Sequence, residues 1–265
     1  MTTGLTLAAV SVSRGHRTIV DDASVSFEAG TVTSVIGPNG AGKSTLLGIA
    51  AGTVRPTSGT ARLGGHDLRR LSVKHAARRR AVMPQDATVA FAFTVREVVA
   101  MGRIPWRDLK SDVDRVVSDA LATTGLTHLQ DREVTTLSGG ERQLTAFARV
   151  VAQATPVTEE SVILLDEPTA AMDIAHAEAT LALVRALARR GAAVGLVLHD
   201  IDAAAAYADR VVLLQHGRVR ASGPVPEVCA SATLSDVYGT PIEVFDRDGR
   251  LHVGPVRRDP VCTGS

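Results

Sequence analysis

The chain has 265 residues, 45% of them hydrophobic, and its 29 basic and 28 acidic side chains give a formal net charge of +1. This length can bury a sizeable core and suits one α/β domain with a helical insertion. The balanced charge gives no support to general nucleic-acid binding, and the apolar stretches fall short of the roughly 20 residues that span a bilayer. Residues 1–4 lead directly into a predicted strand, so we expect no signal peptide.

The first motif lies between a predicted strand and a predicted helix. Residues 31–36 are rich in β-branched side chains and bounded by glycines, which indicates a buried strand, and residues 44–51 are typical of a helix. The segment that joins them, here called the phosphate loop, matches the pattern G-x-x-x-x-G-K-[ST] and consists of Gly37, Pro38, Asn39, Gly40, Ala41, Gly42, Lys43 and Ser44.

The phosphate loop predicts a nucleotide site. Its glycines let backbone N–H groups point at phosphate oxygens, and the N-terminus of the following helix, including Thr45, faces the same anion. Lys43 is expected to reach the β- and γ-phosphates, and Ser44 to ligate Mg²⁺. The alternative, a glycine-rich turn with a chance lysine, is disfavoured by the flanking strand and helix.

Residues 74–80 form a strongly basic run, for which two interpretations remain open. They form either a patch for nucleic acid or lipid headgroups, or the solvated face of a helix before the strand that contains Gln85. We favour the helix. Beyond it, residues 91–125 read as helices, at 94–101 and from 112 to 124, with Gly102 suited to a helix C′ cap and Pro105 beyond it.

A longer helix is predicted through Gln153. Ser138 is placed as its N-cap, and Glu141, three residues later, completes a capping box. The cap leaves Gly139 and Gly140 unexplained, because each costs about 1 kcal/mol relative to alanine unless a ligand must approach the backbone closely. Residues 138–140, here called the Ser-Gly-Gly turn, therefore predict an anion site at a helix N-terminus.

Two acidic residues end the apolar run 162–165. A central parallel strand delivers such carboxylates to its C-terminal edge, where Asp166 is expected to hold Mg²⁺ through water and Glu167 to polarise the attacking water. An ordinary strand that enters an acidic turn is the alternative, and the Pro-Thr and Asp173 that follow disfavour it. Further strands are predicted at 193–198, which ends at His199, and near 211–214 and 219–222.

Together these motifs resemble the ATP-binding cassette (ABC) family over about residues 5–244. The resemblance implies an α/β fold, namely a P-loop ABC ATPase core with a mixed sheet, an antiparallel β subdomain and an inserted helical subdomain at roughly 91–154. It also implies a single nucleotide-binding domain over residues 1–256. The polar segment 257–265 is expected to be a disordered tail.

The same resemblance implies roles for individual residues. Gln85 matches the glutamine that contributes to Mg²⁺ and water, and His199 matches the histidine that senses the γ-phosphate. The Ser-Gly-Gly turn matches the one that binds the γ-phosphate of ATP held by a second subunit, and residues 171–173 match a loop that crosses the dimer interface. The implied ligands are ATP and Mg²⁺, with Ser44, Gln85 and Asp166 around the metal, and Glu167, His199 and Gln85 as the catalytic group.

One position departs from the family pattern. The family commonly stacks adenine on an aromatic side chain ahead of the glycine in the first strand-turn, and here that place holds Arg14, followed by Gly15 and His16. Two alternatives remain open: Arg14 stacks its guanidinium on adenine, or the base is held loosely. His16 is a further candidate for the stacking residue.

A single cassette without fused membrane helices resembles the detached ATPase subunit of a transporter. The resemblance implies a homodimer that works beneath two permease subunits and with an external haem- or siderophore-binding protein. The chain is then expected at the cytoplasmic face of the cell membrane, attached through the permease. A soluble regulatory ABC ATPase without a permease is the alternative from another class.

Two stretches bear on the transported substrate. Residues 93–106, with the only tryptophan, Trp106, resemble the matching segment of importers for ferric siderophores, haem and cobalamin. Residues 154–161 form an extended, proline-containing connection, which resembles that of hemin importer ATPases and favours hemin over ferric siderophore or cobalamin. Trp106 is expected either to contact the permease or to pack within the subdomain.

Scattered histidines and two cysteines complete the candidates. His16, His66, His75 and His216 are expected to be exposed on turns and helices rather than to ligate haem iron. Cys229 and Cys262 lack metal-ligand spacing, so we expect two free thiols.

Overall fold

A six-stranded mixed sheet forms the centre of the computed structural model, which describes residues 4–85, 92–106 and 108–257. Its strand order is β10-β9-β3-β8-β7-β6, with β10 antiparallel to β9 and the other neighbours parallel. The strands are β3 (Val32–Ile36), β6 (Arg80–Met83), β7 (Val162–Asp166), β8 (Ala193–Val197), β9 (Arg210–Gln215) and β10 (Arg218–Pro224). Residues of β3, β7 and β8 are buried throughout, as expected of parallel strands that are covered on both faces.

A second, antiparallel sheet has the order β2-β1-β4-β5. It is formed by β1 (Gly4–Arg14), β2 (Arg17–Glu28), β4 (Ser58–Leu63) and β5 (His66–Asp67). A hydrophobic cluster joins this sheet to helix α1 (Lys43–Ala51) and to one face of the central sheet, and the fully buried Phe27 belongs to it. The predicted mixed sheet and antiparallel β subdomain are thus confirmed.

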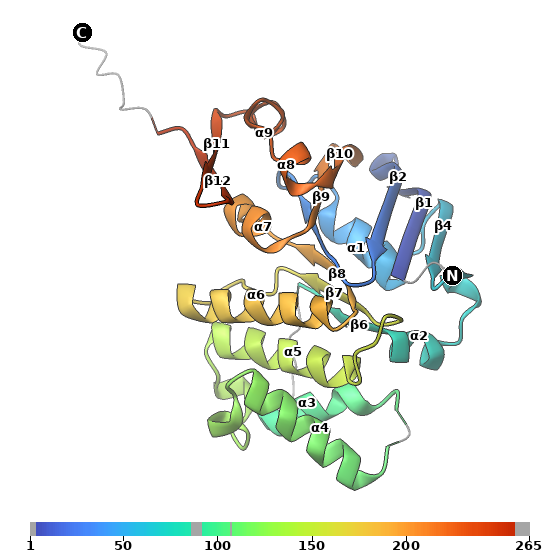
Figure 1. The fold of residues 1–265 in the computed structure, drawn as a ribbon. Coiled ribbons are helices and arrows are strands. Elements are labelled where there is room, and N and C mark those ends of the chain that lie inside the picture. Colours follow the sequence, from blue (N-terminus) through green and yellow to red (C-terminus); the bar gives the residue numbers. More distant parts are fainter. Residues whose placement is uncertain (1–3, 86–91, 107, 258–265) are drawn as a thin grey trace.

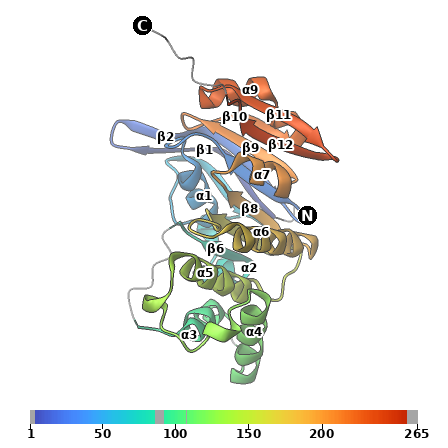
Figure 2. The same cartoon turned by 90° about the vertical axis from the view of Figure 1, so that its left-hand side faces the viewer.

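Nine helices of four or more residues occur in the described ranges. The layer opposite the antiparallel sheet contains α3, α4 and α5, at the end of the molecule away from the C-terminal strands (Figures 1 and 2). The helices are α1 (Lys43–Ala51), α2 (Val73–Arg79), α3 (Val95–Ala100), α4 (Lys110–Thr123), α5 (Gly139–Ala154), α6 (Ile174–Arg189), α7 (Ile201–Tyr207), α8 (Val225–Val228) and α9 (Ser231–Tyr238). Within the described part of the chain, no helix has the length and apolar character that a bilayer crossing requires.

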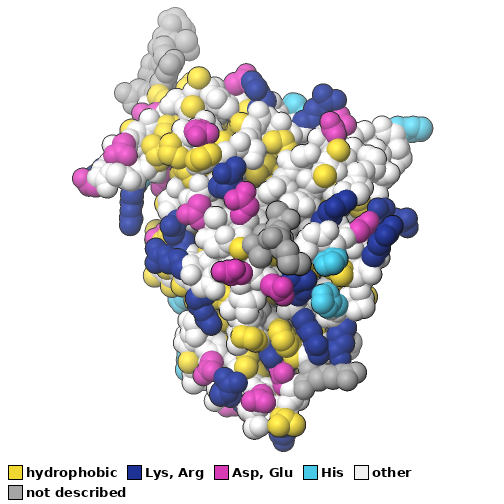
Figure 3. All heavy atoms as spheres, turned by 45° about the vertical axis from the view of Figure 1, so that its right-hand side comes forward, with side chains coloured by type: hydrophobic (Ala, Val, Ile, Leu, Met, Phe, Trp, Pro, Cys, Tyr) yellow, Lys and Arg dark blue, Asp and Glu magenta, His cyan; other side chains and the backbone are white. Residues whose placement is uncertain are grey.

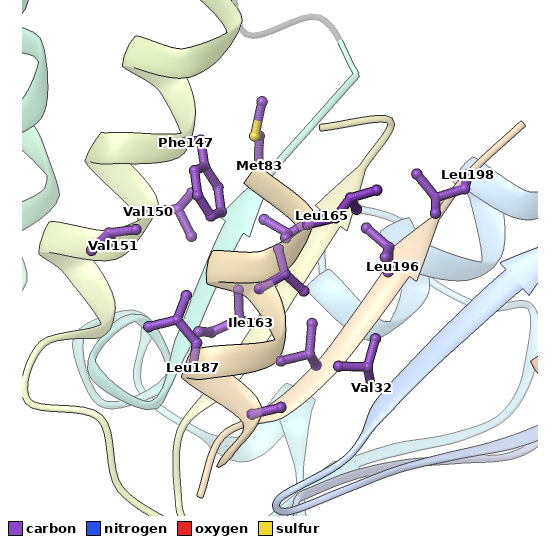
Figure 4. Packing of buried hydrophobic residues seen from close by; sticks show 14 of the residues in the cluster. Val32, Met83, Phe147, Val150, Val151, Ile163, Leu165, Leu187, Leu196 and Leu198 are labelled. Carbon is purple, nitrogen blue, oxygen red and sulfur yellow. The ribbon is translucent and has the colours of Figure 1, made fainter. Parts of the chain in front are cut away.

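Helix α5 holds the helical layer against the sheet. Its apolar face buries Phe147 and Val150 completely, and Figure 4 shows these side chains facing Met83 and Ile163 on the sheet. Burying side chains of this size stabilises the fold by about 1.5–3 kcal/mol each. The start of α5, which carries the Ser-Gly-Gly turn, is therefore fixed relative to the ends of β6 and β7.

A C-terminal hairpin was not predicted. It pairs β11 (Ile242–Arg247) with β12 (Arg250–Pro255) and packs on α7, where the backbone N–H of Val253 donates to Asp202 Oδ1 at 2.9 Å. Free Cys229 is buried, as a small apolar side chain would be. Cys262 and the predicted tail from residue 258 lie outside the described residues.

The basic run before Gln85 forms a helix, as favoured, but its arginines are not on a solvated face. Lys74 and His75 are exposed, and Figure 3 shows Lys, Arg and His side chains gathered on the face that carries α2. Arg78 Nε, however, donates to the Pro105 carbonyl at 2.9 Å, and Arg79 pairs with Glu160 at 3.1 Å. Burial lowers the pKa of Arg80. The second half of the run therefore joins α2 to neighbouring segments.

Trp106 packs within the molecule, which was one of the two alternatives. Its indole N–H donates to the Gln153 carbonyl at 3.0 Å, and the Arg103 guanidinium lies 4.6 Å from the ring centre.

The expected role of Gly102 as a helix cap is wrong. Helix α3 ends at Ala100 and continues as a 3₁₀ turn over Met101–Arg103, without a left-handed residue at Gly102. A Cβ added at Gly102 would overlap the carbonyl oxygen of Arg149 and lie 3.1 Å from the Gln153 nitrogen, so this glycine permits close packing on α5.

The Gly102→Ala variant is expected to lose about 1–3 kcal/mol of unfolding free energy, because the added methyl group forces the 3₁₀ turn and α5 apart. Urea denaturation measures the loss. Gly254→Ala is the matched control, since a Cβ there meets no atom within 4 Å, and it should change stability by less than about 0.5 kcal/mol. Equal stability of both variants would contradict the close-packing role.

Candidate functional site

The phosphate loop connects the end of β3 to the start of α1. Lys43 folds back over the loop, and its Nζ donates to the carbonyls of Gly37 at 2.8 Å and Pro38 at 3.0 Å. The residue is only 6% exposed, and this burial lowers the pKa of Lys43, while the nearby Glu167 and Asp166 carboxylates act in the opposite direction. A cation is thus held at the centre of the loop.

The backbone of the loop has the shape that an anion needs. Gly37, Gly40 and Gly42 have φ of 148°, 76° and 101°, which other residues rarely adopt. A Cβ at Gly37 would also overlap the Leu214 carbonyl oxygen. Helix α1 starts with Gly42 as an N-cap that makes no side-chain hydrogen bond, so its first N–H groups suit phosphate oxygens. The loop therefore fits a nucleotide's phosphates.

Ser44 and Asp166 meet beside the loop, although 122 residues separate them. Ser44 Oγ donates to Asp166 Oδ1 at 3.2 Å. Burial raises the pKa of Asp166, with the Ser44 hydrogen bond opposing the rise. A hydroxyl and a carboxylate are hard oxygen ligands of the kind that Mg²⁺ prefers, so this pair fits the predicted metal site.

The raised pKa gives a test of Asp166 in the nucleotide-free protein. A carboxyl with a higher pKa in the folded than in the unfolded state binds protons more tightly when folded, so ionisation above its ordinary pKa lowers stability as pH rises. Asp166→Asn should therefore melt at a higher temperature than the wild type at pH 7, and the difference should shrink as pH falls to about 4, the ordinary Asp pKa.

Thermal melts between pH 4 and pH 8 measure this difference. Asp67→Asn is the control with the opposite sign, because hydrogen bonds from Arg69 lower the pKa of the partly exposed Asp67. A lower melting temperature for Asp166→Asn at pH 7 would contradict a costly buried charge.

Three predicted catalytic residues meet at one oxygen atom. Gln85 Nε2 donates to Glu167 Oε1 at 3.2 Å, and His199 Nε2 lies 2.5 Å from the same oxygen. The Glu167 side chain is 13% exposed and the His199 side chain 51%, so the carboxylate is sheltered while the imidazole stays accessible. Parallel strands β6, β7 and β8 bring the three residues together, because each follows the C-terminal end of one of these strands.

The Ser-Gly-Gly turn lies apart from the phosphate loop and lines a different part of the surface. Ser138 caps α5 with the predicted capping box, in which Glu141 N–H donates to Ser138 Oγ at 3.2 Å and Ser138 N–H donates to Glu141 Oε2 at 2.7 Å. Among the described residues, no hydrogen bond or ion pair joins this turn to the phosphate loop. Instead the turn lines a separate hollow of about 860 Å³ with Met172 and Asp173.

The candidates for adenine contact, Arg14 and His16, are both exposed at the tip of the β1–β2 hairpin. His66, His75 and His216 are exposed as expected, and the described residues contain no group of three metal-ligating side chains.

Two residues near the site were not given a role by sequence reasoning. Tyr238 of α9 is within hydrogen-bond reach of the Gly37 backbone; burial raises the pKa of Tyr238 to about 12, with that hydrogen bond opposing the rise. Gln143 Nε2 donates to the Glu167 carbonyl at 2.7 Å. Neither contact has a local sequence signal, because each joins segments far apart in the chain.

Comparisons with known proteins identify the family of the chain. The family model for the ABC transporter matches residues 20–170. Proteins named "Hemin import ATP-binding protein HmuV" from Rhodococcus jostii and Nocardia farcinica are 47% and 50% identical to this chain; the alignments cover 89% and 91% of it and 80% and 83% of those proteins.

Solved structures share the fold. A metal-chelate type ABC transporter in an inward-facing conformation matches 96% of this chain and 98% of its own chain, with a TM-score of 0.78 and 27% identity. A dimeric bacterial ABC transporter cassette matches 83% of this chain and 98% of its own chain, with a TM-score of 0.75 and 24% identity.

Proposed function

The chain belongs to the ABC transporter family as an ATPase, and from this premise we propose that it powers the import of hemin across the cytoplasmic membrane. One observation carries the mechanism. Gln85 and His199 converge on one carboxylate oxygen of Glu167, next to the strand that places Asp166 against Ser44. This arrangement suits attack of a water molecule on a terminal phosphate.

Each residue of the cluster has a distinct part in hydrolysis. Lys43 and the N–H groups at the start of α1 bind the phosphates, while Ser44, Asp166 and Gln85 would hold Mg²⁺, which would neutralise phosphate charge. Glu167 accepts a hydrogen bond from the attacking water and raises its nucleophilicity. His199 orients that water and can donate to the γ-phosphate, and its Nε2 lies beside the Glu167 carboxylate.

The Ser-Gly-Gly turn completes the site of a second subunit. The helix N-terminus at this turn carries two glycines, Gly139 and Gly140, and fits a phosphate. It faces a hollow apart from the phosphate loop of the same chain. Two chains arranged head to tail would bring each turn onto the ATP held by the other chain. We infer a homodimer with two ATP molecules in its interface, so that ATP binding closes the dimer and hydrolysis reopens it.

Two observations support hemin as the substrate: the names of the relatives and the form of one connecting segment. The Rhodococcus and Nocardia proteins are named for hemin import, and the 154–161 connection resembles that of hemin importer ATPases. Ferric siderophore or cobalamin import is the alternative within the family. The partners are two permease subunits and an external haem- or siderophore-binding protein, with the chain attached peripherally to the membrane through the permease.

Reconstitution with the neighbouring permease tests the proposal. ATP hydrolysis and uptake are compared with the external binding protein empty, loaded with hemin, or loaded with a ferric siderophore. Stimulation and uptake specific to hemin are expected. A response to siderophore alone would replace the substrate, while full hydrolysis by the isolated chain with no association with a permease would favour a soluble regulatory ATPase.

A further inference from the structure

Two residues in the segment that follows β7 have a left-handed backbone. Glu167 has φ of 52° and Ala171 has φ of 60°, and neither is a glycine. L-residues adopt this conformation at a cost in free energy, so neighbouring groups must hold it in place. Glu167 is the residue whose side chain meets Gln85 and His199, and its backbone conformation therefore decides where the reacting carboxylate points.

Both left-handed residues are contacted by the first turns of α5. Gln143 Nε2 donates to the Glu167 carbonyl at 2.7 Å. Gly140 packs so closely on the same segment that a Cβ there would lie 3.0 Å from the Ala171 carbonyl oxygen. On the opposite side, the Glu167 N–H donates to the Val197 carbonyl at 3.1 Å. The Glu167 peptide groups are thus held between β8 and α5.

We propose that Gln143 is a positioning residue for hydrolysis, which holds the Glu167 backbone so that its carboxylate faces the attacking water. Because Gln143 and the Ser-Gly-Gly turn lie on the same rigid helix, it also links the turn that serves the partner's ATP to the Glu167 that serves the chain's own ATP. This inference rests on the proposed role of Glu167 and extends it to communication between the two sites.

A purely structural bond provides the comparison. Gln153, near the other end of α5, is the same residue type and is also half-buried, and its Nε2 donates to the carbonyls of Ala77 at 2.9 Å and Arg80 at 3.2 Å. These bonds hold α5 to α2 and β6, and none of them involves Glu167. Loss of the Gln153 bonds should affect stability without a direct effect on the carboxylate.

The first test compares Gln143→Met with Gln153→Met in the full-length protein. Methionine keeps the length of the side chain and removes the donor. For Gln143→Met, kcat for ATP hydrolysis should fall about 10- to 10²-fold, the effect of misplacing a reacting group by about 1 Å, while KM for ATP changes less than about 2-fold. Gln153→Met should keep kcat within about 2-fold of the wild type.

If Gln143→Met does not fold, Gln143→Glu replaces it in the test, because glutamate keeps the length and polarity of the side chain but lacks the amide donor. The same fall in kcat is expected. Wild-type kcat in a folded Gln143 variant, or an equal fall for Gln153→Met, would overturn the inference.

A second test asks whether Gln143 acts through the Glu167 carboxylate. Gln143→Met is combined with Glu167→Gln, and hydrolysis is followed in single-turnover assays. If the two residues act as a unit, the double variant should be no slower than Glu167→Gln alone, within about 2-fold. A further 10-fold loss in the double variant would show an independent role and overturn the inference. Unchanged hydrolysis in Glu167→Gln alone would instead refute the proposed catalytic role of Glu167.

Discussion

Glu167→Gln is expected to lower ATP hydrolysis about 10²–10⁴-fold while ATP binding is retained, because the amide cannot act as a base. Glutamine fits the same space, and Gln85 and His199 can still contact its side-chain oxygen, so the site should keep its shape. Lys43 and the start of α1 are unchanged in this variant. An ATP-bound dimer should therefore accumulate, which size-exclusion chromatography with ATP detects beside a steady-state hydrolysis assay.

Glu178→Gln is the matched control for this variant. Its carboxylate also accepts one short hydrogen bond, from the Tyr207 hydroxyl at 2.5 Å, but it lies on α6 away from the phosphate loop. Hydrolysis by Glu178→Gln should stay within about 2-fold of the wild type. Wild-type hydrolysis by Glu167→Gln would contradict the catalytic assignment.

Ser138→Arg is expected to reduce hydrolysis to near the background level without loss of ATP binding by the monomer. The large side chain would occupy the space beside the start of α5 in which the Ser-Gly-Gly turn is proposed to bind the partner's γ-phosphate. The chain's own phosphate loop makes no hydrogen bond or ion pair with this turn among the described residues, so monomer binding should survive. Nucleotide titration and dimer assembly in the Glu167→Gln background separate the two effects.

Loss of a helix cap alone costs about 1 kcal/mol and must be distinguished from loss of the phosphate site. Thr94→Arg supplies this control, because Thr94 and Glu97 form the same capping box at the start of α3. Both variants should lose similar stability, but only Ser138→Arg should lose hydrolysis. Full hydrolysis by Ser138→Arg would refute sites shared between two subunits.

Predictions from local spacing agree with the structure wherever the contact is also local. The capping box at Ser138 and Glu141 spans three residues, and the structure has both of its hydrogen bonds. The strand, loop and helix around Lys43 likewise match, since backbone conformation over ten residues follows from glycine positions and apolar periodicity. Gly102 shows the limit: its place after α3 suggested a cap, but its neighbours Arg149 and Gln153 lie about 50 residues away.

Local patterns in the sequence are enough to predict the α/β class, the phosphate chemistry and the order of the motifs, because each motif is a short segment whose residues act together. The three-dimensional packing was needed to show that Gln85 and His199 share one oxygen of Glu167. It also showed that Arg78 and Arg79 bond other segments and that Gln143 donates to the Glu167 backbone. These contacts join residues brought together by strand order and by the packing of α5 on the sheet. Both arise from burial of apolar side chains across the whole chain, which no local pattern records.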